Sequence, residues 1–186
     1  MASATHILTL PGPMLRRGFW LYVWRVETPT GELLYVGRTG DNSSPHASAP
    51  YTRMGQHLGS APTQNALRKH LEKRGLPLED CVFHLVSHGP LYDEVAKADG
   101  APRAALLAAH TPLRDIVGAM EKALADELSA AVYAVLNTVN CKWPLDAALW
   151  APVRAAFAEH FPRLNAAPPP GRESSHLTFG NVKGTN

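Results

Sequence analysis

The densest apolar pattern lies near the beginning of the chain. Phe19 to Val26 is rich in aromatic and β-branched residues and is apolar on both faces, which predicts a strand in the centre of a sheet. A turn containing Pro and Gly separates it from a second apolar run, Leu33 to Gly37, and this short connection predicts an antiparallel hairpin. Cys81 to Ser87 has the same strand-like composition. The pattern therefore predicts three strands.

A helical period governs much of the remaining chain. From Leu113 to Val135, apolar residues recur at three- and four-residue steps, which predicts one long amphipathic helix with its apolar stripe in the core. Shorter helices are expected over Tyr51–Leu58, over Thr63–Arg74 with Thr63 as its cap and Gly75 beyond its end, over Tyr92–Lys97, over Arg103–Ala109 and over Leu145–His160.

These elements predict an α+β fold, in which helices flank a small three-stranded antiparallel sheet and a helical extension follows at the C-terminus. The expected organisation is an irregular lead-in over residues 1–17, a main domain over 18–143 with insertions at about 40–50 and 89–112, a helical extension over 144–164, and a disordered tail over 165–186.

The composition is that of a globular protein. The 186 residues are 45% hydrophobic and 18% charged, which argues against wholesale disorder. The two cysteines, Cys81 and Cys141, form no CxxC motif, which excludes a disulfide scaffold and a cysteine zinc site. No apolar run approaches the roughly 20 residues of a membrane helix, and the first residues do not form a signal peptide. A cytoplasmic protein with no membrane partner is expected.

Charge is distributed unevenly along the chain. The net charge is +2, but residues 1–75 carry +5 and the remainder carries −3. A basic half within a nearly neutral chain favours a local surface for a polyanion. In the helix expected at 63–74, basic residues face outward, where they would contact a nucleic-acid backbone irrespective of its sequence. These residues are Arg68, Lys69, Lys73 and Arg74.

Several polar residues occupy positions where they could form a site. Tyr22 and Tyr35 lie in neighbouring strands, and Arg53 and His57 share a helical face because they are four residues apart. Taken singly, each has an ordinary explanation, as a packed aromatic residue or part of a solvated helix face. The same holds for Glu121, which could simply lie at the boundary of the apolar helical stripe, and for Asn137, which could simply cap the helix.

In combination, these residues resemble the GIY-YIG nuclease family. The first motif of that family corresponds to Leu21-Tyr22-Val23, without its glycine, and the second to Tyr35-Val36-Gly37. The helical Arg and His, the metal-binding Glu and the final Asn of the family correspond to Arg53, His57, Glu121 and Asn137. The resemblance covers about residues 19–141, and it alone ranks Glu121 above a rival ligand, Glu127.

The resemblance implies a metal-dependent endonuclease that hydrolyses phosphodiester bonds. Glu121 would be the only protein carboxylate on a single Mg²⁺ or Mn²⁺ ion, and Arg53 would hold the phosphate. Tyr22 would be the general base, provided that cationic neighbours lower its pKa. Arg38 would be a second cationic contact to the phosphate or would help to lower that pKa. Tyr35 would orient water or phosphate, although the roles of the two tyrosines could be exchanged. His57 would relay a proton or bind phosphate, and Asn137 would position the site.

DNA is the expected substrate, with RNA as an alternative, and a protein partner or a dimer could direct the cutting. Two other functions compete with this interpretation. One is a nucleic-acid-binding module that keeps the fold but does not cut. The other is a protein-interaction domain that docks through its long helix and its C-terminal helix.

Overall fold

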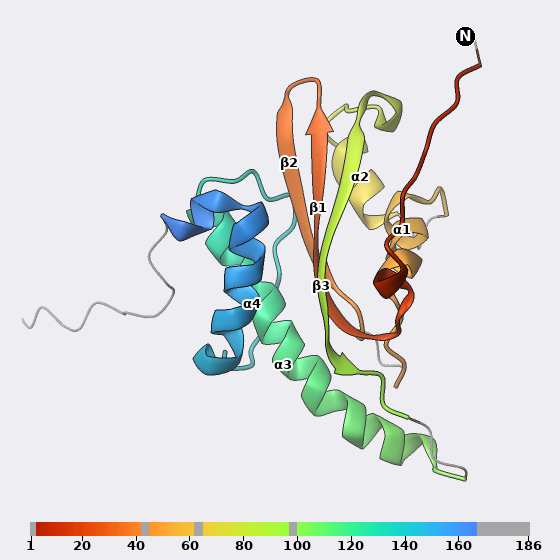
Figure 1. Cartoon of the computed structure of the whole chain (residues 1–186), viewed down its shortest axis with the longest axis vertical. Helices are drawn as coiled ribbons and strands as arrows, with labels where there is room; N and C mark the ends of the chain where they lie inside the picture. Colours follow the sequence, from red (N-terminus) through yellow and green to blue (C-terminus); the bar gives the residue numbers. More distant parts are fainter. Residues whose placement is uncertain (1–2, 42–44, 62–64, 97–99, 167–186) are drawn as a thin grey trace, which may run out of the picture.

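The computed structural model of the chain describes residues 3–41, 45–61, 65–96 and 100–166. These residues form three strands and four helices, joined by loops and short 3₁₀ turns (Figure 1). In chain order the elements are η1 (Gly12–Leu15), β1 (Gly18–Thr28), β2 (Gly31–Arg38), α1 (Pro50–Leu58), α2 (Ala66–Glu72), η2 (Leu78–Asp80), β3 (Val82–Asp93), α3 (Arg103–Ala130), α4 (Ala147–His160) and η3 (Pro162–Asn165).

The three strands form one antiparallel sheet in the order β2-β1-β3. This arrangement confirms the predicted hairpin and the central position of the first strand, which is buried along most of its length. In the register of β1 and β2, Tyr22 lies opposite Gly37, and Trp24 lies opposite Tyr35. Because side chains alternate between faces, both tyrosines point to the same side of the sheet.

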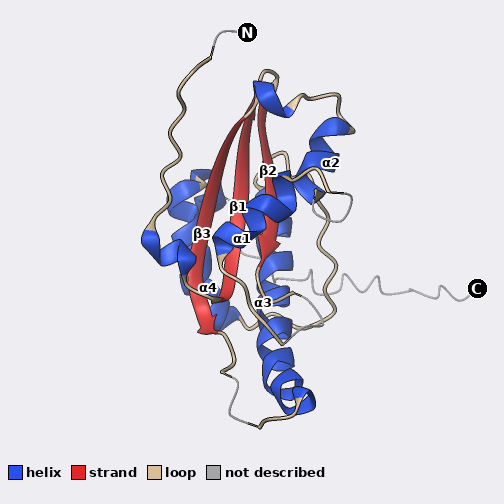
Figure 2. Cartoon of the chain, turned by 90° about the vertical axis from the view of Figure 1, so that its right-hand side faces the viewer, coloured by secondary structure: helices blue, strands red, loops and turns tan. Residues whose placement is uncertain are grey.

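Helices cover both faces of the sheet, so the molecule has three layers. Helices α3 and α4 lie on one side of the sheet, and α1 and α2 lie on the other (Figures 1 and 2). Odd-numbered β1 residues such as Leu21 and Val23 pack in the core with α3 and α4, whereas Tyr22 and Trp24 pack with Leu67 of α2. This alternation produces two cores, one on each face.

The shorter helices lie close to their predicted positions. Helix α1 ends before Gly59, as expected, and Asp146 caps α4 by accepting hydrogen bonds from two backbone amides of its first turn. After α2, Gly75 has φ +68°, and the amide of Leu76 donates to the carbonyl of Leu71 in a Schellman closure. The predicted cap Thr63 lies outside the described residues.

The long helix is the largest correction to the predicted elements. Helix α3 begins at Arg103 and absorbs the short helix predicted there, because Pro112 does not break it. It ends at Ala130 rather than Val135, since Val132 has φ 62° and is 79% exposed. Val135 instead forms a parallel bridge with Leu34 on the edge of β2. The last part of the apolar stripe is therefore extended chain.

The third strand is longer than its apolar run. Strand β3 continues to Asp93, so the helix predicted from Tyr92 to Lys97 is wrong at its start, where Tyr92 pairs with Phe19. Pro90 is tolerated because it lies in an edge strand, at the register shift between the Phe19–Tyr92 and Leu21–His88 pairs. Lys97 lies outside the described residues.

The ends of the chain differ in detail from the predicted boundaries. The described part of the lead-in contains one 3₁₀ turn, η1, and residue 165 ends the turn η3. Residues 167–186 of the predicted tail lie outside the described residues. No helix in the described part of the chain has both the length and the hydropathy needed to cross a membrane.

Candidate active site

Six of the predicted polar side chains meet near the C-terminal end of β2. They come from two strands and from helices on both faces of the sheet, and they interact through hydrogen bonds, ring contacts and charge. β2 is an edge strand, so groups from both faces can approach one another around it. The six residues are Tyr22, Tyr35, Arg38, Arg53, His57 and Glu121.

A glycine makes room for the buried tyrosine. A Cβ atom at Gly37 would lie 2.5–2.6 Å from the ring and hydroxyl of Tyr22, a separation that Cβ atoms do not tolerate. The glycine of the second predicted motif is thus required by close packing of the two strands. The first motif needs no glycine in this chain, since Leu21 is fully buried in the opposite core.

Tyr22 and His57 form the centre of the cluster. The Tyr22 hydroxyl lies 2.7 Å from Nε2 of His57, and the ring of Tyr35 packs against the imidazole at 4.9 Å. Nδ1 of His57 is buried and has no hydrogen-bond partner among the described residues. Burial, reinforced by the charge of Arg53, lowers the pKa of His57 to about 4. The imidazole is therefore neutral at pH 7.

The two tyrosines do not have the lowered pKa expected from their cationic neighbours. Burial raises the pKa of Tyr22 far above that of a free tyrosine, and this outweighs the lowering by Arg53 and Arg38. Burial and the charge of Glu121 likewise raise the pKa of Tyr35. Both are phenols at neutral pH, so Tyr22 cannot act as an ionised base without passing on its own proton.

Arg53 is almost fully buried within the cluster. One terminal nitrogen donates to the Gln56 side chain at 2.7 Å, and the other donates to the carboxylate of Asp41. Its Nε–H is buried without a partner among the described residues. Asp41 is a site residue that the sequence analysis did not single out, although it directly follows the second motif and Arg38-Thr39-Gly40.

Arg38 links β2 to the long helix. Its Nε donates to Oε2 of Glu121 at 2.8 Å, and Nη1 donates to the carbonyl of Arg114. A Cβ atom at Gly118 would lie 3.1 Å from the guanidinium, so this glycine on α3 leaves space for the arginine. Burial raises the pKa of Glu121 despite the opposing charges of Arg38 and Arg53.

Glu121 could hold one divalent cation, but only together with another ligand. Its Oε1 receives no hydrogen bond from the described residues, and carboxylate oxygen is a suitable donor for Mg²⁺ or Mn²⁺. The described residues contain no group of three or more His, Cys, Asp or Glu side chains that could bind a metal by themselves. A cation here would share its coordination with water and a bound phosphate.

The rival carboxylate, Glu127, has a different place in the fold. It is 4% exposed, and its two oxygens accept hydrogen bonds from Trp150 at 2.7 Å and from Arg154 at 2.5 Å. Both donors belong to α4, so Glu127 joins the two helices on the far side of α3 from the cluster. Its oxygens are not available to a metal ion.

Asn137 supports the cluster from outside it. Its side chain accepts a hydrogen bond from the Val36 amide at 2.9 Å and donates to the Val36 carbonyl at 2.8 Å. The chain before it also pairs with β2, because the carbonyl of Leu34 accepts from the amide of Leu136. Asn137 therefore holds the edge strand that carries Tyr35 and Arg38.

The four basic residues predicted to face outward from α2 do not all do so. Arg68 donates to the carbonyls of Leu58 and Gly59, so it closes the C-terminal end of α1. Lys69, Lys73 and Arg74 are exposed to solvent. The outward orientation predicted from the helical pattern thus applies to three of the four residues.

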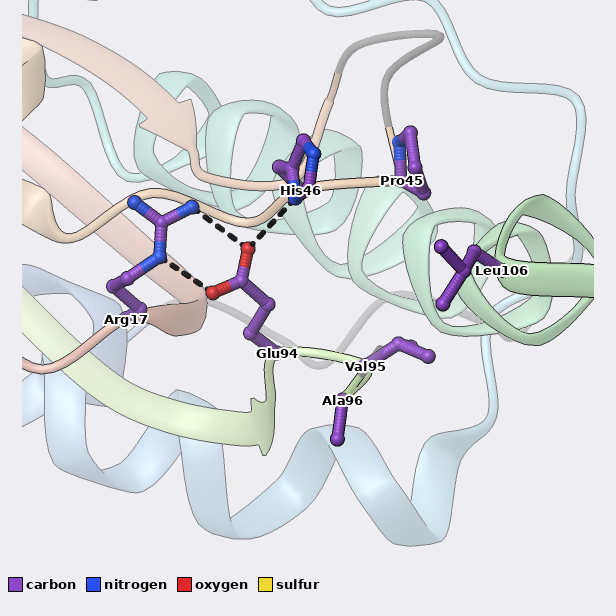
Figure 3. A pocket seen from close by; sticks show the side chains of 7 residues that line it. All are labelled: Arg17, Pro45, His46, Glu94, Val95, Ala96 and Leu106. Atoms are coloured by element: carbon purple, nitrogen blue, oxygen red, sulfur yellow. Dashed lines mark hydrogen bonds and ion pairs between the residues drawn. The ribbon is translucent and has the colours of Figure 1, made fainter. Parts of the chain in front are cut away.

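A cavity of about 320 Å³ lies apart from this cluster (Figure 3). Its polar wall is Glu94, which accepts hydrogen bonds from Arg17 at 2.7 Å and lies 3.3 Å from His46. The hydrogen bonds from Arg17 are the main cause of the lowered pKa of Glu94. The side chains of Arg17, His46 and Glu94 in the described lining therefore pair with one another.

No protein-family model, curated protein or solved structure matches this chain.

Proposed function

We propose that this protein is a metal-dependent endonuclease that hydrolyses phosphodiester bonds, with DNA as its substrate. The observation that carries the proposal is the meeting of a Tyr–His hydrogen bond, two arginines and one carboxylate at a single edge of the sheet. These groups supply a proton acceptor, positive charge for a phosphate and an oxygen ligand for a cation. Their order along the chain, and the four-residue spacing of Arg53 and His57, also resemble those of the GIY-YIG motifs.

The proton path runs from water through Tyr22 to His57. Tyr22 keeps its proton because burial raises its pKa, while His57 is neutral because burial lowers its pKa to about 4. As a water attacks phosphorus, the Tyr22 oxygen accepts the water proton and its own proton passes to Nε2 of His57 over the 2.7 Å contact. Tyr22 remains the group next to the water, and His57 is the final acceptor. Tyr35 packs on His57 and fixes the plane of the imidazole.

The arginines balance the charge of the scissile phosphate. The guanidinium of Arg53 supplies donors to non-bridging oxygens, with Asp41 holding it in place in the absence of substrate. Arg38 orients Glu121 through the 2.8 Å hydrogen bond to Oε2, which leaves Oε1 for a cation. Mg²⁺ or Mn²⁺ bound at Glu121 would stabilise negative charge on the phosphate and on the leaving oxygen.

Incubation with supercoiled plasmid and with branched and single-stranded oligonucleotides tests this function. Wild-type protein is expected to cut in Mg²⁺ or Mn²⁺ and to stop in EDTA. Glu121→Gln, which removes the charge and keeps the shape, is expected to retain binding and lose cutting. Asp126→Asn, at an exposed acidic position on the same helix, is the matched control and should cut normally. Binding without cutting by wild type in either metal would contradict the enzyme and leave a binding module.

A further inference from the structure

A second polar cavity adjoins the candidate active site. It has a volume of about 240 Å³ and lies between the end of β2, helix α3 and the loop after Asn137. Arg38 and Asp41 line it, and these two residues also bind Glu121 and Arg53, respectively. A molecule in this cavity would therefore lie next to the proposed scissile phosphate.

The residues that line the cavity include an exposed aromatic side chain. Trp143 is 44% exposed, whereas the other three tryptophans of the chain are 1–3% exposed and belong to the cores. The ammonium of Lys142 lies 4.9 Å from the centre of the Trp143 ring. Burial in a core does not explain this tryptophan, because it is 44% exposed and is one of the residues that line the cavity.

Lys142 is the one cation of the described cavity lining that has no carboxylate partner there. Arg38 pairs with Glu121, and Arg114 pairs with Asp115 at 2.8 Å. An aromatic surface beside an unpaired cation suits a nucleotide, since the base can stack on the ring and the phosphate can meet the ammonium. Bases in a duplex are already stacked, so a base that reaches Trp143 must be unpaired.

We infer that Trp143 and Lys142 form a subsite for one unpaired nucleotide that flanks the scissile phosphate. This inference rests on the proposed nuclease function and defines its substrate class as nucleic acid with a single-stranded segment or end. The base stacks on Trp143, and the adjoining phosphate contacts Lys142. DNA and RNA share this chemistry, so the experiment compares binding of a DNA and an RNA of the same sequence.

Fluorescence titration of the full chain in EDTA tests the subsite without cutting. The probes are a short single-stranded DNA, an RNA of the same sequence and a blunt DNA duplex of that sequence. Single strands are expected to change the emission of Trp143 and to bind Trp143→Ala about 5- to 150-fold more weakly than wild type, the range for losing one base–aromatic stack. The affinity for the duplex should fall by less than about twofold in Trp143→Ala. Lys142→Gln should reduce the salt slope of single-strand binding by about 0.7.

The control is Leu149→Ala, which removes another exposed apolar side chain, 42% exposed on α4, and should bind all probes like wild type. Thermal melting verifies the fold, and Trp143→Leu replaces Trp143→Ala if the latter does not fold. Equal binding of single strands by wild type and variant, or equal losses for single strand and duplex, would overturn the subsite alone. Absence of binding of every probe by wild type would overturn the proposed function as well.

Discussion

Gly37 and Tyr22 face each other across β1 and β2, and their packing leaves no space for a Cβ atom. Gly37→Ala should lower the free energy of unfolding by about 1–3 kcal/mol, the usual cost of overpacking a core. Gly55 in α1 has no atom near its Cβ position, so Gly55→Ala should instead stabilise the protein by about 0.5–1 kcal/mol. Urea unfolding measures both changes. A neutral Gly37→Ala would show that the tyrosine ring is not held over this glycine.

His57 gives the stability a defined dependence on pH. Burial lowers its pKa in the folded protein to about 4, whereas an unfolded histidine binds a proton near pH 6.5. As the pH falls from about 6.5 to about 4, the unfolded state therefore binds more protons, and the free energy of unfolding should decrease by about 3 kcal/mol. His57→Gln lacks this contribution, so its stability should change less over the same window.

Urea unfolding at several pH values measures the difference between wild type and His57→Gln. The difference isolates His57 from Glu121, whose raised pKa acts with the opposite sign because the folded protein retains that proton more strongly. His6→Gln removes an exposed histidine and serves as the control. Parallel stability curves for wild type and His57→Gln would mean that His57 is accessible to solvent.

At the scale of elements, α3 carries two glutamates with separate tasks. Glu127 joins α3 to α4 through Trp150 and Arg154, so Glu127→Gln removes the buried charge that Arg154 contacts and should lower the free energy of unfolding by about 1–3 kcal/mol. Its cutting rate, measured well below the melting temperature, should stay close to wild type. Chemical unfolding and a cleavage assay on the same preparation measure the two effects. Normal stability of this variant would contradict the link between the helices.

The edge of β2 is a second element whose pairing can be tested. Asn137 replaces a neighbouring strand by bonding both polar groups of the Val36 backbone. Asn137→Ala should therefore speed amide hydrogen exchange at Val36 and lower stability by about 1–3 kcal/mol. Asn140→Ala, at an exposed position in the following loop, should do neither. Unchanged exchange at Val36 would contradict this role.

The sequence predicts the elements well where local chemistry decides them and less well where contacts between distant segments do. Aromatic and β-branched residues in β1, and the glycine after α2, have local signatures that place those elements correctly. The end of α3 has no such signature, because Val132 and Val135 continue the helical period. Pairing of Val135 with Leu34, about 100 residues earlier in the chain, favours the extended conformation of this segment.

In the candidate site, too, local spacing is predicted from the sequence and contacts between distant segments are not. The spacing of Arg53 and His57 on one helical turn indicates that they share a face, and the structure places both in the cluster. The pKa of Tyr22 could not be predicted in this way, since it depends on how completely three layers of structure exclude water. Asp41 and Gly118 were missed because their partners, Arg53 and Arg38, become neighbours only in the fold.

At the scale of the whole molecule, the exposed basic residues after and within α2 provide a test of nucleic-acid contact. Lys73 and Arg74 are exposed, and each phosphate that they contact should contribute about 0.9 to the slope of log affinity against log salt. The double variant Lys73→Gln/Arg74→Gln should therefore have a slope about 2 smaller for duplex DNA. Arg16→Gln, whose charge is paired with Asp93, should leave the slope unchanged. Equal slopes would place the DNA on another face.

The most direct test of the site as a whole is the rate of cleavage by Tyr22→Phe, which removes one oxygen atom. This hydroxyl stands between the attacking water and His57 in the proposed proton path, so its loss should reduce the single-turnover rate by about 10²- to 10⁴-fold. Tyr133→Phe, which removes a hydroxyl that accepts a hydrogen bond from Arg163, should cut like wild type. Cleavage by Tyr22→Phe within threefold of a folded, active wild type would contradict the Tyr22–His57 path, and a wild type that cuts no substrate would contradict the nuclease itself.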